Sequence, residues 1–381
     1  MKRVAIRFLL LAISVLIGLA AVEVALRLGN LFRPPNDPPR PRRADLYQAD
    51  ERVGYRLWTS TKMCYRYPVS NGRVLSVNSN SDGFRSEREF DEPDSRTRIV
   101  VTGDSFVFGD GVEIRERLTE VLEGMEPGWR VDNLGMTGWG IDLMIRAVET
   151  IGPKARPDVV VLGIYTDDFT RQRPFYSGMG FPTPRFRLER GSLVSAPYPR
   201  LAWWKSLRVV QAAYQSYWRL VPDPHELNNA LFDRFLAEAQ RQEFMPVLMF
   251  IPGKYDGRVD SKRRRFLDQF AKEQGVAYLD LTEPIHGAGV DNTYIRGNWH
   301  WNPAGHRIAA LELHRLLKAR GLDRARSEST GFPTMSVPSQ TGSMDKTQKA
   351  VNRLQSLAVR ASLTTQTGDG ACQEDFGPPS G

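Results

Sequence analysis

The chain has 381 residues, 41% hydrophobic and 25% charged, which suffices for one large domain with appendages or for two ordinary domains. Lysine and arginine outnumber aspartate and glutamate by 52 to 44, but the basic residues are dispersed and are not interleaved with stacking aromatics. This pattern favours a solvated surface and argues against nucleic acid as a partner. Two cysteines, Cys64 and Cys372, are too few for a disulfide framework or a cysteine-based metal site.

The N-terminus is basic and continues as an apolar run over residues 8–22, which Glu23 interrupts. Adding residues 24–28 makes the segment long enough to span a bilayer. The small residues at 20–21 form a poor cleavage site, so we predict an uncleaved membrane anchor over residues 1–30. The arginines after the run favour a cytoplasmic domain, whereas the short N-terminal tail favours export. We predict export, with the domain on the periplasmic side of the membrane.

Three further segments flank or precede the main domain. Residues 31–43 are rich in proline and arginine and predict a stiff linker, whose arginines could rest on anionic lipid head groups. Residues 44–96 contain short β-like pieces between turn residues and predict an extension packed on the domain. Residues 325–381 have few large apolar side chains and predict a disordered tail.

Residues 97–324 alternate between strand and helix patterns. The predicted strands are 98–102, 129–133, 158–165, 246–251 and 276–281, and the predicted helices are 118–125, 141–151, 225–243, 263–274 and 303–320. Strands that alternate with helices pair in parallel, so we predict a three-layer, doubly wound α/β domain. Residues 171–222 interrupt the alternation and are rich in proline, arginine and aromatics. They are predicted to be an insertion that either roofs the site or, as we favour, packs an amphipathic helix on the domain.

Polar residues follow the predicted strands, at the sheet edge where parallel sheets bind ligands. The first strand leads into Gly103-Asp104-Ser105, where a serine between strand and helix lies near backbone N–H groups that can stabilise an oxyanion. The same serine could simply cap the helix. A glycine-rich loop over residues 133–140 follows the second strand, and Thr166-Asp167-Asp168 follows the third.

His300 precedes the last predicted helix, in a loop that returns to the sheet edge carrying Ser105. In a Ser–His pair the imidazole takes the hydroxyl proton and then passes it to the leaving group. A lone histidine is more often structural, but the position of this loop together with Ser105 favours a catalytic role for both residues.

The order of these segments resembles the SGNH/GDSL hydrolase superfamily over residues 80–320. The matching segments are Asn80-x-x-Gly83-Phe84-Arg85, which is similar to exported and anchored bacterial members, Gly103-Asp104-Ser105, Asn133-x-Gly135-x-x-Gly138 and His300-Trp301-Asn302-Pro303-x-Gly305-His306. The resemblance implies a flavodoxin-like sheet with Ser105 as nucleophile and His300 as general base. It also implies an oxyanion and binding region with the N–H groups of Ser105 and Gly138, beside Asp104 and Asp167. We expect no cofactor and no metal.

Two positions depart from the family pattern. The family carries asparagine as an oxyanion donor where this chain has Asp167, and loss of one such donor costs about 10²–10³ in rate. An ionised Asp167 would repel the oxyanion, so Asp167 must be protonated, turned away or not the true equivalent of the family asparagine. The family aspartate before the histidine is replaced by Asn298, which can orient His300 but supplies no charge, a change that costs roughly 10⁴ in a serine protease. Asp291 and Asp256 are candidate substitutes for the missing carboxylate.

The leading hypothesis is an esterase or deacetylase that acts on acyl esters, including acyl esters of surface carbohydrates. An O-acyltransferase differs from it only in passing the acyl group to a sugar hydroxyl. A catalytically impaired glycan-binding protein is the second class, and Asp167 and Asn298 support it. A metal-dependent hydrolase using His300, His306, Asp291 and Asp167 is disfavoured, because His306 is expected on the packing side of a helix.

Overall fold

The computed structural model describes residues 2–32, 46–67, 73–173, 179, 181, 183–196, 203–221, 223–255 and 257–322. Most of the predicted linker, Asp256 and the predicted disordered tail lie outside these residues, as does Cys372.

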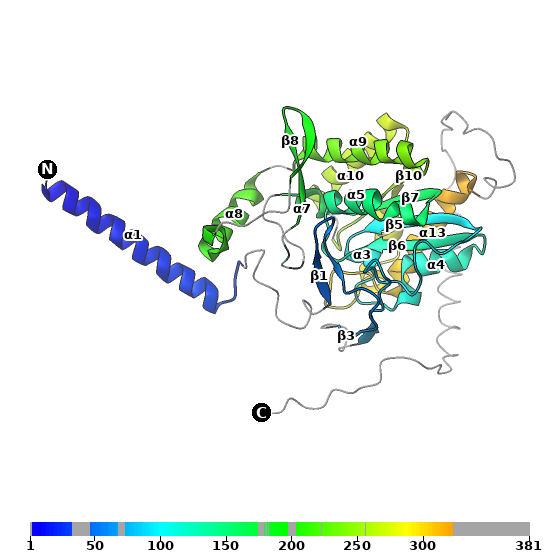
Figure 1. Cartoon of the computed structure of the whole chain (residues 1–381), viewed down its shortest axis with the longest axis horizontal. Helices are drawn as coiled ribbons and strands as arrows, with labels where there is room; N and C mark the ends of the chain where they lie inside the picture. The colour runs from blue at the N-terminus through cyan, green and yellow to red at the C-terminus, as the bar shows by residue number, and fades with distance from the viewer. Residues whose placement is uncertain are drawn as a thin grey trace, which may run out of the picture.

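A parallel sheet forms the centre of the molecule (Figure 1). Its strands are β5 (Thr97–Gly103), β6 (Trp129–Gly135), β7 (Val159–Tyr165), β10 (Met245–Ile251) and β11 (Ala277–Asp280). They lie in the order β11-β10-β7-β5-β6, and every neighbouring pair is parallel. Numbered along the chain and read from the β6 edge, this order is 2-1-3-4-5, the flavodoxin-like arrangement. The predicted strands and the doubly wound α/β class are therefore confirmed.

Helices cover both faces of the sheet, so the strands are buried on each side and appear in the sequence as continuous apolar runs. Alternate residues of β5 show this, since Val100 belongs to one buried cluster and Val101 to the other. The first cluster includes α5 (Ile141–Thr150), α9 (His225–Gln242) and α10 (Arg258–Gln274), and the second includes α4 (Leu118–Met125) and α13 (Pro303–Ala319). Short helices complete the layers: α3 (Ser105–Phe108), η1 (Ile114–Glu116), α6 (Gly152–Ala155), α7 (Asp168–Arg171), α11 (Thr282–Gly287) and α12 (Val290–Thr293).

The start of α10 differs from its prediction. The helix begins at Arg258, five residues before the predicted start, with Gly257 as its N-cap residue. Its first turns are strongly charged, so they carry no apolar periodicity that would mark them as helical.

The N-terminal extension forms two antiparallel hairpins. They are β1 (Tyr47–Asp50) with β2 (Gly54–Leu57), and β3 (Cys64–Arg66) with β4 (Val74–Ser76). Tyr55 and Phe84 are fully buried in the same cluster as Trp139 and Leu143 of the main domain. The extension therefore shares the hydrophobic core of the domain and can place its own residues near the sheet edge.

The insertion contains a hairpin of β8 (Arg185–Glu189) with β9 (Ser192–Ala196), followed by η2 (Trp203–Ser206) and α8 (Arg208–Leu220). Phe186 of the hairpin is buried in the domain core. The favoured prediction placed an amphipathic helix on the domain. A helix does form, but its most extensive contact with another element is with α1 (Lys2–Leu28). Two hydrogen bonds join side chain to backbone across this contact: Arg208 donates to the Leu26 carbonyl, and the Val209 amide donates to the Glu23 carboxylate.

The N-terminal helix projects from the domain (Figure 1). Its segment Arg3–Leu28 has a mean hydropathy of 2.6 and none of its apolar window is buried in the structure. It is long and apolar enough to cross a membrane, as predicted, although a signal sequence has the same properties. The side of the membrane on which the domain lies stays a prediction.

Candidate active site

Ser105 lies at the carboxyl end of β5, as the first residue of α3. The turn between them is tight, because a Cβ on Gly103 would lie 2.3 Å from a Val107 methyl and 2.8 Å from the Gly163 carbonyl oxygen. Asp104 caps α3, since its Oδ1 accepts a hydrogen bond from the Phe106 amide at 2.9 Å. The serine is therefore held at the helix start beside the first backbone N–H groups.

A buried ion network supports this turn. Arg171 of α7 lies between two carboxylates, with its Nη1 2.8 Å from Asp104 Oδ2 and 2.6 Å from Asp168 Oδ1. The same nitrogen donates to the Trp139 carbonyl at 3.0 Å, next to Gly138. Burial, followed by the nearby charge of Asp104, raises the pKa of Asp168, and Arg171 opposes that rise. One cation thus joins the turn at Ser105 to the glycine-rich loop.

His300 meets Ser105 from the far end of the chain. Its Nε2 lies 2.8 Å from Ser105 Oγ, which is hydrogen-bonding distance. The Ser105 hydroxyl also lies 3.3 Å from Asp104 Oδ2, which is a longer contact. The structure therefore brings together the two residues that the sequence placed on one sheet edge.

The other ring nitrogen of His300 faces two neutral groups. Nδ1 lies 3.0 Å from Asn298 Oδ1 and 2.9 Å from the Tyr67 hydroxyl, and Asn298 Nδ2 donates to the same hydroxyl at 3.0 Å. Asn298 Oδ1 also accepts from the His300 amide at 3.2 Å, which identifies this atom as the amide oxygen. Because that oxygen can only accept, the proton belongs on Nδ1, and the lone pair of Nε2 can accept the Ser105 proton.

Asp110 is a buried carboxylate close to this pair. Its Oδ2 lies 3.9 Å from His300 Nε2, and its amide donates to the Ser105 carbonyl at 3.0 Å. It approaches the nitrogen that faces the serine, so it does not occupy the place of a triad carboxylate, which contacts Nδ1. A carboxylate at this distance can still stabilise a positively charged imidazole.

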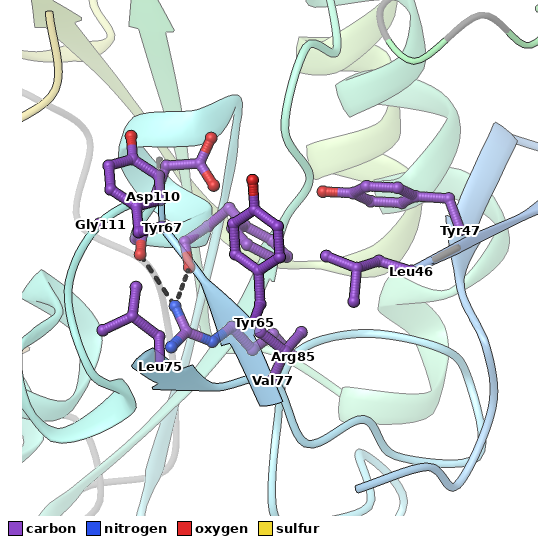
Figure 2. A pocket seen from close by; sticks show the side chains of 11 residues that line it. Leu46, Tyr47, Tyr65, Tyr67, Leu75, Val77, Arg85, Asp110 and Gly111 are labelled. Carbon is purple, nitrogen blue, oxygen red and sulfur yellow. Dashed lines mark hydrogen bonds between the residues drawn. The ribbon is translucent and has the colours of Figure 1, made fainter. Parts of the chain in front are cut away.

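The loop that carries Asp110 is fastened by Arg85, the last residue of the Asn80-x-x-Gly83-Phe84-Arg85 segment. Figure 2 shows its guanidinium hydrogen-bonded to the backbone of this loop. The side chain is fully buried and donates to the carbonyls of Gly109 at 2.8 Å, Val112 at 2.9 Å and Ser76 at 2.7 Å. Burial lowers the pKa of Arg85 to about 10, so the group remains charged at neutral pH. Beside it lies a cavity of about 10 Å³, room for about one water molecule.

The glycine-rich loop after β6 reaches the same region. Gly138 has a φ of +81°, a left-handed conformation that favours glycine. A Cβ on Gly140 would lie 2.7 Å from the Arg171 side chain, so this loop can approach the ion network only with glycine there. Asn133 is structural, because its amide donates to the Val107 carbonyl and to Thr119 Oγ1.

Asp167 is turned outward. Its side chain is 62% exposed and lies 3.3 Å from Arg263 of α10, whose guanidinium also donates to the Thr166 carbonyl at 2.8 Å. This orientation corresponds to one alternative considered from the sequence, in which the carboxylate is turned away from the site. It offers no donor to an oxyanion.

The residues considered as metal ligands are separated. His306 is buried on α13 and its Nδ1 accepts from the Leu118 amide at 3.3 Å; burial lowers its pKa to about 3, so it is neutral. Across the described parts of the chain, no group of three or more His, Cys, Asp or Glu is arranged to hold a metal ion.

Sequence reasoning missed three residues of the site: Tyr67, Asp110 and Lys254. Lys254 follows β10, and its Nζ donates to the Asn298 carbonyl at 2.9 Å, which fastens the histidine loop. Asp110 lies five residues after Ser105, so its nearness to the serine could have indicated it. Tyr67 comes from the N-terminal extension, and no motif or spacing links it to His300.

Two aromatic side chains stand at the rim of the site. Trp299, next to His300, is 60% exposed, and its ring meets the exposed Tyr255 ring edge-on with centroids 6.0 Å apart. Large exposed aromatics beside a reactive pair are unusual for a solvated surface and offer an apolar platform to a ligand.

Comparison with known proteins gives structural similarity only. No family model and no curated protein matches the chain. The solved structures it resembles include a member of the lipolytic G-D-S-L family from Veillonella parvula. The two sequences are 15% identical, and the match covers 58% of this chain and 98% of that chain, with a TM-score of 0.39. Another is the psychrotrophic esterase EstA from Pseudoalteromonas sp., with 13% identity, 60% and 100% covered, and a TM-score of 0.40. At these values the assignment of the fold depends on the strand order and not on the similarity.

Proposed function

We propose that the chain is a serine ester hydrolase in which Ser105 attacks an acyl ester and His300 is the general base. The observation that carries the proposal is the 2.8 Å contact between Ser105 Oγ and His300 Nε2 at the carboxyl end of β5. A serine between strand and helix, with a histidine acceptor and backbone N–H groups beside it, suits acyl transfer.

The reaction proceeds in two halves. As Ser105 Oγ attacks the ester carbonyl carbon, its proton passes to His300 Nε2, and the carbonyl oxygen becomes an oxyanion that the N–H groups of Ser105 and Gly138 stabilise. The intermediate then expels the alcohol, which takes the proton from Nε2 and leaves an acyl-serine. In the second half water attacks the acyl carbon, His300 accepts its proton, and the carboxylic acid leaves as Ser105 is reprotonated.

The imidazolium formed in each half is stabilised without a carboxylate at Nδ1. Asn298 and Tyr67 hold the ring in the required tautomer through neutral hydrogen bonds, and Asp110 supplies negative charge from the side of Nε2. Arg171 pairs with Asp104 and Asp168, and burial raises the pKa of Asp168 and so favours its neutral form, which together reduce the buried negative charge near the oxyanion. This arrangement supports turnover at a lower rate than a site with a complete triad.

The favoured substrate is an acyl ester of a carbohydrate. Sugar rings carry an apolar face of C–H groups, and the exposed Trp299 and Tyr255 rings beside His300 offer a complementary platform. Replacing both residues with alanine should raise the KM for an acetylated oligosaccharide about tenfold and leave hydrolysis of p-nitrophenyl acetate within twofold, corresponding to a loss of about 1.4 kcal/mol of sugar binding. Equal effects on both substrates would exclude a sugar platform.

The test of the proposed reaction compares wild type with Ser105→Ala on p-nitrophenyl acetate. We expect wild-type turnover that falls to background in the variant. Background activity in both proteins would favour the glycan-binding alternative, which Asn298 supports. Repeating the assay with an oligosaccharide acceptor separates the two enzymes, because an O-acyltransferase forms acetylated sugar whereas a hydrolase releases acetate.

We also propose that the domain lies on the periplasmic side of the membrane. The short N-terminal tail ahead of the signal-like apolar run supports export of the domain. Protease added to intact spheroplasts should then degrade the domain while α1 stays with the membrane. Protection of the domain until the cells are lysed would place it in the cytoplasm instead.

A further inference from the structure

Aromatic side chains project from the molecule near the end of the candidate membrane helix. Trp203 is 78% exposed, Trp204 46% and Tyr217 58%. They belong to residues 203–221, named here the aromatic segment, which comprises η2 and α8 and contains three basic and no acidic residues. Tryptophan and tyrosine beside basic residues are typical of surfaces at the boundary between lipid and water.

The contact between α1 and α8 fixes the depth of this segment relative to a membrane. The Val209 amide donates to Glu23 at 2.9 Å, and Arg208 donates to the Leu26 carbonyl at 3.0 Å. Leu26 lies two residues, roughly 3 Å along the helix, before the end of the apolar span at Leu28. The head-group zone extends about 5–8 Å beyond the hydrocarbon on each side. The start of α8 therefore lies at the boundary between the hydrocarbon and that zone when α1 spans the bilayer.

Glu23 has a structural purpose in this contact. A carboxylate in a membrane helix is costly unless it is paired. One oxygen of Glu23 accepts from Arg27 at 2.7 Å, and the other accepts from the first turn of α8, where negative charge is favoured by the helix dipole. Arg208 in turn satisfies a carbonyl in the last turn of α1. The residue that interrupts the apolar run thus joins the two helices at the membrane surface.

We propose that the aromatic segment is a second membrane contact, in which Trp203 and Trp204 insert into the lipid head-group layer of the bilayer that α1 spans. Lipid is the occupant because the segment is hydrogen-bonded to the end of the membrane helix itself, at the depth where aromatic side chains are most stable. The inference depends on α1 being embedded and is independent of the ester hydrolase chemistry.

The test uses the full-length protein in vesicles of phosphatidylcholine brominated at acyl carbons 6 and 7 or at carbons 11 and 12. We expect tryptophan fluorescence to be quenched more by the shallow label. The Trp203→Phe/Trp204→Phe double variant should lose at least about half of that quenching, because these exposed residues contribute most of the lipid contact. Trp58→Phe, at another exposed tryptophan outside the segment, is the matched control and should keep the wild-type quenching.

Equal quenching in the double variant and the wild type would overturn the proposal. Aqueous iodide, which quenches exposed tryptophan, gives a second test. If vesicles leave Trp203 and Trp204 accessible to iodide and only an added second protein shields them, the proposal is also overturned. Extraction with alkaline carbonate separates failure of the anchor from failure of the contact. Protein that resists extraction but shows no difference between the variants is anchored without the proposed contact. Glu23→Ala should stay in the membrane but lose part of the shallow quenching, and unchanged quenching would contradict the role given to Glu23.

Discussion

The loops that carry Ser105 and His300 are held in place by different chemistry. The serine loop is fastened by buried charged groups, with Asp104 paired to Arg171 and with Arg85 donating to backbone carbonyls. The histidine loop is fastened by one charged donor, Lys254, and its imidazole is oriented by the neutral side chains of Asn298 and Tyr67. Hydrogen bonds with a charged partner are about twice as strong as neutral ones. Ser105, the proposed nucleophile, is therefore rigidly placed. His300, the proposed proton acceptor, is well oriented but weakly stabilised once it is charged.

Removal of the His300 imidazole tests the histidine loop and has the largest expected effect. His300→Ala should lower kcat/KM for p-nitrophenyl acetate by about 10⁴-fold, because Ser105 then lacks a proton acceptor. His286→Gln is the matched control, since His286 contacts the Gly253 carbonyl and lies outside the Ser–His pair. A loss of less than tenfold in His300→Ala would mean that another group activates the serine.

Removal of Arg171 tests whether buried charged groups fasten the serine loop. Arg171→Met leaves Asp104 and Asp168 buried without their cation and should lower the free energy of unfolding by about 3–5 kcal/mol, measured by urea denaturation. Since the pKa of Asp168 is raised by burial, protonation at acidic pH relieves the unpaired charge, and the loss should be smaller at pH 5 than at pH 8.

Arg187→Met provides the control, because Arg187 pairs with Glu189 on an exposed hairpin and should change stability by less than about 0.5 kcal/mol. Similar losses in the two arginine variants would contradict the view that buried charge fastens the serine loop.

A carboxylate in place of the Asn298 amide would give the histidine loop the charged partner for His300 that it lacks. Asn298→Asp should raise kcat/KM at least about tenfold, because a negative charge beside Nδ1 stabilises the imidazolium. The acidic limb of the pH–rate profile should move to higher pH for the same reason. A fall in activity with an unmoved profile would show that the neutral arrangement is required.

Removal of the Tyr67 hydroxyl should have the smallest effect of the four. Tyr67→Phe is expected to lower kcat by about 3–10-fold with KM unchanged, since one neutral hydrogen bond contributes roughly 1 kcal/mol. Tyr65→Phe, in β3 and two residues before Tyr67, is the control and should keep kcat within twofold. Equal changes in the two variants would indicate a general disturbance of the extension rather than orientation of His300.

The sequence predicted the strands and the sheet class because these depend on local patterns. It placed Ser105 and His300 together because both lie in loops at the same sheet edge and match segments of the family pattern. Buried parallel strands are continuous apolar runs, and strand ends gather at one edge. It could not predict Tyr67 or the orientation of Asp167, because each depends on a partner far along the chain: Tyr67 contacts His300, and Asp167 contacts Arg263. The contact of α8 with α1 was missed for the same reason, since an aromatic, amphipathic helix has no pattern that tells a protein core from a lipid surface.

The central claim is that Ser105 is a nucleophile activated by His300. A fluorophosphonate probe followed by peptide mass spectrometry tests it directly, because the probe forms a covalent bond only with an activated serine. We expect a single adduct on Ser105 in the wild type, which is lost in Ser105→Ala and strongly reduced in His300→Ala. An unmodified Ser105, or labelling that is equal in wild type and His300→Ala, would contradict the claim.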